Sequence, residues 1–419
     1  MRRPLVFVAS LTLAAVAACA GEREAGPHPD VVVDTIGDTV VVHTLAGSAW
    51  GGDATLVAEL VIGEMEGDLE YLFGQIASIA VGADGTIYVV DRQVPELRAY
   101  GPDGVFRAVI GPAGEGPGEL KGPDGGLAVL SDGRILVRDP GNARIQVYSP
   151  EAEALDAWPH RGGFFTSTPM YRDRRDNVYV STLMDPQADI RDWVIGLARI
   201  SPDGLPGDTL LPPDGGYEAP ALEARSPDGS GVSRTSVPFA PTEEWTLHVD
   251  GYFLHGISTE YRIDVLNPEG PVRIIRRFEP VPIAAAERAE EEARISRNMR
   301  RTQPGWRWSG PAIPDQKPPF RDIYAGRDGR IWVSVSLPSY ERDDPDYDAT
   351  DPEAVEDRWR DGVGFDVFEP DGTYLGRVTT PEGFATYPTP IFNGELVWAA
   401  MIDDLGVHRV VRFRVARGP

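Results

Sequence analysis

The chain has few of the residues that cross-link proteins or coordinate metals, and it lacks several common catalytic motifs. Its 419 residues include one cysteine and six histidines. The histidines show neither HxH nor HExxH spacing, and the sequence has no GxSxG elbow and no Walker A loop. No hydrophobic run is long enough to cross a bilayer. These absences exclude the zinc, serine-nucleophile and nucleotide-binding signatures that can be recognised in a sequence.

Positive charge is also scarce, since 40 Lys and Arg face 65 Asp and Glu and the net charge is −25. This acidity argues against binding to nucleic acid or to anionic lipid head groups. An acidic run at 343–348 resembles a calcium loop only superficially. Read from Asp344 as an EF-hand, it has Ala349 where glycine is required and Val355 where glutamate is required. We interpret the run as a solvated loop and predict no metal ligands there.

A short turn recurs along the chain, each time followed by a run of β-branched and aromatic residues. An Asx-Gly pair supplies the positive φ angles of a tight hairpin, so each turn predicts a junction between two strands. The turns are Asp84-Gly85, Asp132-Gly133, Asp176-Asn177, Asp250-Gly251, Asp328-Gly329 and Asn393-Gly394.

The first two units repeat in register. A shift of 48 residues places Asp84 on Asp132, and it also places residues 91 and 100 on 139 and 148. A second series of turns, Pro-Asp-Gly or Pro-Glu, follows the first, so each unit has four strands. We therefore predict an all-β fold, a six-bladed β-propeller. A β-sandwich is the alternative, but a sandwich does not require a repeat in register.

The ends of the chain and its insertions complete this prediction. The last unit lacks a fourth strand, and residues 56–63 match the fourth strand of the first unit, so an N-terminal strand should close the last blade. Residues 287–301 predict one helical insertion, between blades 4 and 5. The long insertions should all emerge on one face, called the top face below, and form a rim over an axial pocket. They span 213–237, 281–319 and 337–361.

The N-terminus has the layout of a secretory signal: two arginines, a short apolar core, and small residues before Cys19. This pattern resembles the bacterial lipoprotein lipobox, which implies cleavage before Cys19 and lipidation of its thiol. We expect a bacterial cell-envelope protein, periplasmic or extracellular, held to the membrane through that lipid alone. The expected divisions are a signal peptide at 1–18, the lipidated cysteine with a tether and N-terminal hairpin at 19–54, and the propeller at 55–419.

Two segments carry a family resemblance. Residues 82–91 (GADGTIYVVD) and 139–148 (DPGNARIQVY) look like NHL repeats. With the lipobox, the chain resembles bacterial six-bladed propeller lipoproteins of the NHL/TolB-like type. The resemblance implies a scaffold that binds a peptide, a protein or a carbohydrate, and it does not imply one activity. Some propellers of this superfamily are metal-dependent lactonases or amidating lyases.

We therefore predict a lipid-anchored binding module with its pocket on the top face. Charged and imidazole side chains near that face are the candidate ligand-binding residues: Asp91, Arg92, Arg138, Asp139, His160, Arg161 and His255. We assign no catalytic or metal-binding residue and no cofactor, although a divalent metal at the axis stays open. One alternative is a metal-dependent hydrolase or lyase with an axial site. Another is a structural component of an envelope assembly that meets a basic partner.

Overall fold

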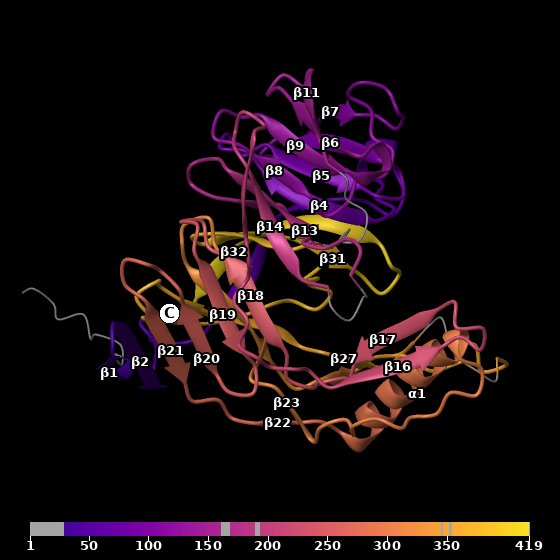
Figure 1. The fold of residues 1–419 in the computed structure, drawn as a ribbon. Coiled ribbons are helices and arrows are strands. Elements are labelled where there is room, and N and C mark those ends of the chain that lie inside the picture. Colours follow the sequence, from indigo (N-terminus) through magenta and orange to yellow (C-terminus); the bar gives the residue numbers. More distant parts are fainter. Residues whose placement is uncertain (1–28, 161–167, 189–192, 345–346, 352–353, 419) are drawn as a thin grey trace, which may run out of the picture.

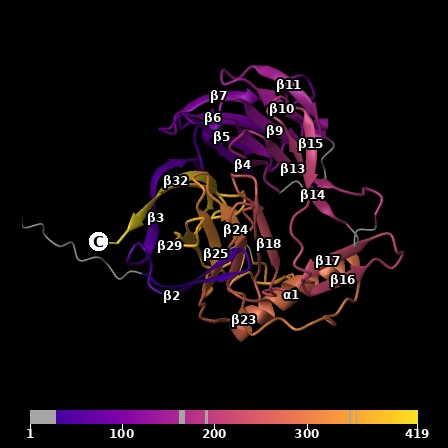
Figure 2. The same ribbon diagram turned by 60° about the vertical axis from the view of Figure 1, so that its left-hand side comes forward.

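A computed structural model describes residues 29–160, 168–188, 193–344, 347–351 and 354–418. These residues are mostly β-structure with one α-helix, and the β-strands form antiparallel four-stranded units. Figures 1 and 2 show these units arranged around the middle of the molecule. Within each unit except the last, which takes β3 as its outer strand, the strands follow chain order, and this is the arrangement of a β-propeller blade.

The first two units are the pair that repeats in sequence. The first contains β4 (Ile76–Val81), β5 (Ile87–Asp91), β6 (Glu96–Tyr100) and β7 (Phe106–Gly111). The second contains β8 (Leu127–Val129), β9 (Ile135–Asp139), β10 (Arg144–Tyr148) and β11 (Ala154–Pro159). Gly85 and Gly133, in the turns that begin these hairpins, have φ of 83° and 87°. The glycines of these turns therefore adopt the left-handed backbone that the sequence predicted, whereas Asp84 and Asp132 keep a negative φ. Short 3₁₀ turns, η1 (Leu69–Tyr71) and η2 (Pro140–Asn142), flank these units.

The next two units differ in what is added to them. The third contains β12 (Tyr171–Arg172), β13 (Val178–Leu183), β14 (Ile195–Ile200) and β15 (Pro206–Leu210). The fourth contains β18 (Glu243–Leu247), β19 (Phe253–Ile257), β20 (Arg262–Val265) and β21 (Val272–Arg276). An N-terminal hairpin of β1 (Asp30–Ile36) and β2 (Thr39–Ala46) extends the fourth unit, because β2 pairs in parallel with β21.

The last two units are joined through the N-terminal part of the chain. One contains β24 (Phe320–Ala325), β25 (Ile331–Ser336), β28 (Val363–Phe368) and β29 (Tyr374–Thr379). The other contains β30 (Ile391–Asn393), β31 (Leu396–Ile402), β32 (His408–Arg417) and β3 (Ala54–Ile62). β3 pairs antiparallel with β32, with Leu56 opposite Val415 and Ile62 opposite Val410. The predicted pairing of the N-terminal strand with the C-terminal strand is confirmed.

Apolar side chains from neighbouring units pack together and hold the arrangement. One cluster joins Tyr88 and Val90 of the first unit to Leu127 and Ile135 of the second. Burying each such side chain contributes roughly 1.5–3 kcal/mol. The strands alternate between two buried faces, so the core lies between the sheets. Within the described residues, no helix has the length and apolarity needed to cross a membrane.

The three insertions pack on one another and form what we call the insertion lobe. Its elements are β16 (Ala221–Arg225), β17 (Val232–Ser236), β22 (Val281–Pro282), α1 (Ala285–Thr302), β23 (Gln316–Lys317), β26 (Tyr340–Glu341) and β27 (Trp359–Arg360). The helix covers residues 285–302, close to the predicted 287–301. It packs on β16 and β17, and Glu290 accepts hydrogen bonds from the backbone amides of Arg358 and Trp359, each at 3.0 Å. The lobe lies on the opposite side of the molecule from β4–β11 (Figures 1 and 2).

Candidate functional site

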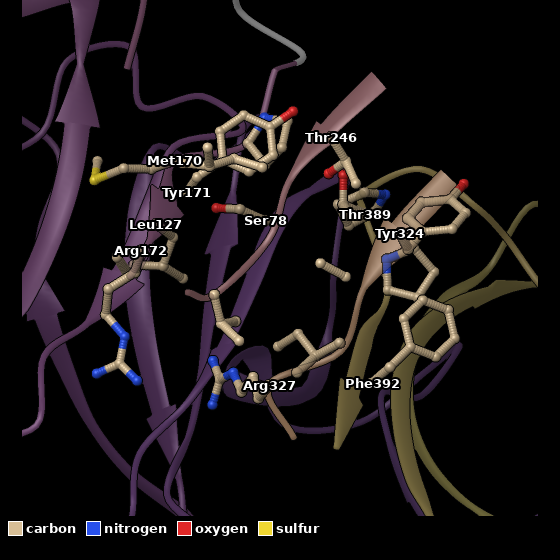
Figure 3. Close-up of a pocket in the computed structure, with 18 of the residues that line it drawn as sticks. Ser78, Leu127, Met170, Tyr171, Arg172, Thr246, Tyr324, Arg327, Thr389 and Phe392 are labelled. Carbon is tan, nitrogen blue, oxygen red and sulfur yellow. The ribbon is translucent and has the colours of Figure 1, made fainter. Parts of the chain in front are cut away.

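The first strands of all the units meet around a central cavity of about 280 Å³. Each strand, or the residues just before or after it, contributes to the wall, so the cavity follows the axis of the fold. Figure 3 shows Tyr171, Thr246, Tyr324 and Phe392 converging on it from four different strands. A cavity lined by apolar and aromatic side chains with a few polar groups is typical of a small-ligand site.

Two carboxyl groups lie near the starts of the strands β18 and β24. Asp322 of β24 lines the cavity, and burial raises the pKa of its carboxyl group. Glu244 of β18 is the second, and burial together with the charge of Asp322 raises its pKa to about 7. Glu244 lines an adjoining pocket whose other wall belongs to the insertion lobe. Two neighbouring carboxyls of this kind can hold one proton near neutral pH and can act as acid and base.

Arginine side chains gather at the other ends of the same strands. Arg172 ends β12 and Arg327 follows β24, and their guanidinium groups lie near one another at one end of the cavity (Figure 3). From Asp322 to the end of β24 at Ala325 the extended chain covers about 10 Å. The cavity therefore has a carboxyl end and a guanidinium end.

The two arginines differ in how their charge is neutralised. Arg172 pairs with Asp176, with the guanidinium nitrogen 2.9 Å from the carboxylate oxygen. Arg327 instead donates to the backbone carbonyl of Val81 at 2.6 Å, and no carboxylate lies within ion-pair distance of it among the described residues. Burial, with the charge of Arg172, lowers the pKa of Arg327 to about 10. An anion at this end would offset the cost of burying that charge.

The turn after β24 places Arg327 here. Arg327 occupies the position just before the Asp-Gly turn, where Ala83, Ser131, Val249 and Phe392 stand in four other units and an arginine, Arg175, stands in the third. Its backbone amide donates to the carbonyl of Phe392 at 2.8 Å, so its main chain is held against the neighbouring unit. A long cationic side chain at this position, found in two of the units, was readable from the repeat. We did not single it out from the sequence.

The predicted residues Asp91 and Asp139 end β5 and β9, and both are fully buried. Asp91 accepts hydrogen bonds from the backbone amides of Gly74 and Gln75 at 2.8 and 3.1 Å. Asp139 accepts the equivalent bond from Gly122 at 2.8 Å, in line with the 48-residue shift. These carboxylates organise the loops before β4 and β8. A ligand-binding role for them stays a prediction.

Three other predicted residues lie around the same part of the fold. Arg138 is buried and pairs with Asp124, with Nε 2.7 Å from Oδ1, and it donates to the carbonyl of Thr168 at 2.8 Å. His160 lies close to Arg138. Burial and the positive charge of Arg138 together lower the pKa of His160 to about 4. Arg92 is exposed, and its charge acts on Asp124. The structure therefore brings Arg92, Arg138 and His160 to one side of the axis, around Asp124.

The remaining predicted residues are placed elsewhere. His255 lies in β19, where its Nε2 is 2.7 Å from a carboxylate oxygen of Glu243. Arg161 and Cys19 lie outside the described residues. Sequence reasoning missed Arg172, Glu244, Asp322 and Arg327, because only the fold brings these distant positions together.

Two further expectations concern metals and the insertion lobe. No group of three or more His, Cys, Asp or Glu side chains able to hold a metal ion occurs among the described residues. Arginines of α1 are paired within the lobe: Arg294 contacts Glu291, and Arg297 lies 3.6 Å from Asp351. Glu291 and Arg294 of α1 line the same pocket as Glu244, so the lobe lies beside the start of β18.

The sequence matches no family profile and no curated protein. Solved structures with a similar fold include a DUF4221 family member from Bacteroides vulgatus, at 12% identity and a TM-score of 0.46, covering 87% of this chain and 99% of that one. Virginiamycin B lyase from Staphylococcus aureus is similar at 12% identity and 0.39, covering 82% and 97%. A gluconolactonase from Xanthomonas campestris is similar at 14% and 0.36, covering 86% and 99%. At values this low we draw no conclusion from them about the site.

Proposed function

We propose that the chain is a six-bladed β-propeller, anchored in the cell envelope through a lipid on Cys19, that binds a ligand in its axial cavity. The strand order of the units and the pairing of β3 with β32 support the closed ring. The basic, apolar and small-residue segments before Cys19 support the anchor. The ligand is an elongated peptide or carbohydrate that carries a carboxylate at one end.

The observation that carries this proposal is the state of Arg327. It is a partly buried cation beside a second cation, Arg172, with no carboxylate partner among the described residues. Burying an uncompensated charge costs free energy, so such a group persists where a ligand supplies the opposite charge. A carboxylate between the two guanidinium groups would gain charge-assisted hydrogen bonds from both. The rings of Tyr171 and Phe392 offer flat surfaces to the rest of the ligand.

The test replaces Arg327 and a matched arginine outside the cavity. Arg330 follows in the same turn and pairs with Glu369 at 3.0 Å, and it does not line the cavity. We would measure calorimetric binding of an acidic tripeptide and a uronic-acid disaccharide, each beside its neutral amide. Arg327→Met should weaken binding of an acidic probe about tenfold, while Arg330→Met should not. Equal affinity of the parent and Arg327→Met for both probes would reject the axial site.

The anchor needs its own experiment, because it does not depend on the ligand. In Cys19→Ser the only thiol of the chain is removed, so no lipid can be attached to a cysteine. The parent should partition into the detergent phase and the serine variant into the aqueous phase. A serine variant that partitions with the parent would show that Cys19 does not carry the anchor.

A second function, acid–base hydrolysis or elimination, is favoured by Glu244 and Asp322. A carboxyl with a pKa of about 7 exchanges protons readily near neutral pH. Glu244→Gln keeps the shape and removes the proton exchange, so turnover of a panel of chromogenic esters and lactones should be lost with binding retained. A panel that the parent does not turn over at any pH would leave binding as the function.

A further inference from the structure

A second concentration of arginine lies away from the axis, in a groove of about 560 Å³ between two neighbouring units. The groove is bounded by residues 276–282 at and after the end of β21, by residues 336–338 after β25, and by Arg377 of β29. Leu45 of the N-terminal hairpin forms part of its wall. We call it the arginine groove.

Two arginines of this groove share one carboxylate. Asp366 of β28 is fully buried, and its Oδ2 lies 2.6 Å from a guanidinium nitrogen of Arg276. Its Oδ1 lies 2.9 Å from Nε of Arg377. Two guanidinium groups against one carboxylate leave one positive charge, and about a fifth to a quarter of each arginine side chain (20% and 24%) remains exposed. The pair therefore presents excess positive charge to the groove.

Aromatic side chains hold these arginines in place. The hydroxyls of Tyr261 and Tyr374 donate to Asp366 at 3.0 and 3.1 Å. The guanidinium of Arg276 lies 4.1 Å from the centre of the Tyr374 ring. Because the positions are set by these contacts before any ligand arrives, little conformational entropy would be lost on binding.

The rest of the groove combines one more cation with apolar surface. Arg277 is exposed and makes no ion pair with any described residue. Glu279 adds one negative charge to the lining of the groove. Three arginines against Asp366 and Glu279 leave the groove with a net charge of +1, in a chain of net charge −25. Leu45, Phe278 and Pro280 supply apolar contacts beside the charges. An anion attached to an apolar body fits both features.

We propose that the arginine groove is a second binding site, distinct from the axial cavity, for a carboxylate carried on an apolar body. The carboxylate contacts Arg276, Arg377 and Arg277, and the apolar body lies against Leu45 and Phe278. This site does not depend on the axial site, since no residue lines both cavities.

The experiment is calorimetric titration of the full chain with hexanoate, with hexanol and inorganic phosphate as comparison probes. Hexanoate should bind more tightly than either, because hexanol lacks the charge and phosphate lacks the apolar body. Arg377→Met and Arg277→Ala should each weaken hexanoate binding about tenfold. In Arg377→Met, Asp366 keeps Arg276 as a partner, so we expect the fold to persist, and thermal unfolding checks this.

Two control variants separate this groove from other positive charges. Arg273 lies in the same strand β21 but pairs with Asp264 at 2.6 Å and does not line the groove. Arg273→Ala should bind hexanoate like the parent, and the axial variant Arg327→Met should keep the binding event that Arg377→Met and Arg277→Ala weaken. The proposal is overturned if Arg377→Met and Arg277→Ala also bind like the parent, or if Arg327→Met alone loses binding. Hexanol or phosphate binding as tightly as hexanoate would refute the ligand class.

Discussion

Buried acidic side chains behave differently at the ends of β5 and β9 and at the axis. Asp91 and Asp139 each accept several backbone amide hydrogen bonds, so the protein itself stabilises their negative charge. At and beside the axis the pKa values of two carboxyls are raised, that of Asp322 by burial and that of Glu244 by burial and the charge of Asp322. A charged residue beside a predicted turn is therefore a poor guide to a binding site. A buried charge that the fold leaves incompletely neutralised is a better one.

The largest effect should come from removing one of the hydrogen-bonded carboxylates at the ends of β5 and β9. Asp139→Ala removes the acceptor for the amides of Lys121 and Gly122 and for the side chain of Asn142. Because buried donors are left unpaired, we expect the free energy of unfolding to fall by about 3 kcal/mol. Urea titration measures it. Asp103→Ala, in an exposed turn, is the matched control and should cost less than about 1 kcal/mol.

A smaller effect should come from neutralising the axial carboxyl. The folded pKa of Glu244, about 7, lies above its ordinary value of 4.5, so the folded state holds the proton more tightly. Stability should therefore fall as pH rises from about 4.5 through 7, by on the order of 2 kcal/mol. Glu244→Gln should remove this fall in unfolding experiments across that range. An unchanged pH profile in the variant would assign the fall to another group.

His160 should show the opposite sign in nearly the same pH range. Burial and Arg138 hold its folded pKa near 4, below the ordinary 6.5, so the neutral imidazole is the folded form. Stability from this group is present above pH 6.5 and is lost as pH falls through 4, by on the order of 1 kcal/mol. His160→Asn should reduce this loss of stability between pH 6.5 and pH 4, as measured by urea unfolding at each pH. Combining it with Glu244→Gln should remove both slopes if the two sites are independent.

The smallest effect is expected at Arg92. Its side chain is exposed, and it acts on Asp124 only through its charge, whereas Arg138 contacts that carboxylate directly. Arg92→Ala should change the free energy of unfolding by less than about 0.5 kcal/mol. If the free energy of unfolding fell as much as in Asp139→Ala, the exposed charge of Arg92 would be as important for stability as the hydrogen-bonded carboxylates.

Much of the fold could be predicted from the sequence, because local chemistry determines it. The Asx-Gly turns set the hairpins, the 48-residue shift set the shared register, and residues 56–63 were recognisable as a missing strand. The parallel pairing of β2 with β21 was not predictable in this way, since no local signal links Val40 to Val272. The axial site was missed for a similar reason. The raised pKa of Glu244 arises from burial and from Asp322, which is distant in sequence.

The pairing of β3 with β32 has a consequence for synthesis. β3 (Ala54–Ile62) is synthesised well before its partner, β32 (His408–Arg417). At typical rates of translation the interval between them is on the order of tens of seconds. During that time β3 has an unpaired edge and carries Val57 and Val61, which stay half exposed even in the finished fold. A nascent chain that stalls before residue 408 cannot form this pairing, so a premature stop before β32 should be as damaging as the loss of β3 itself.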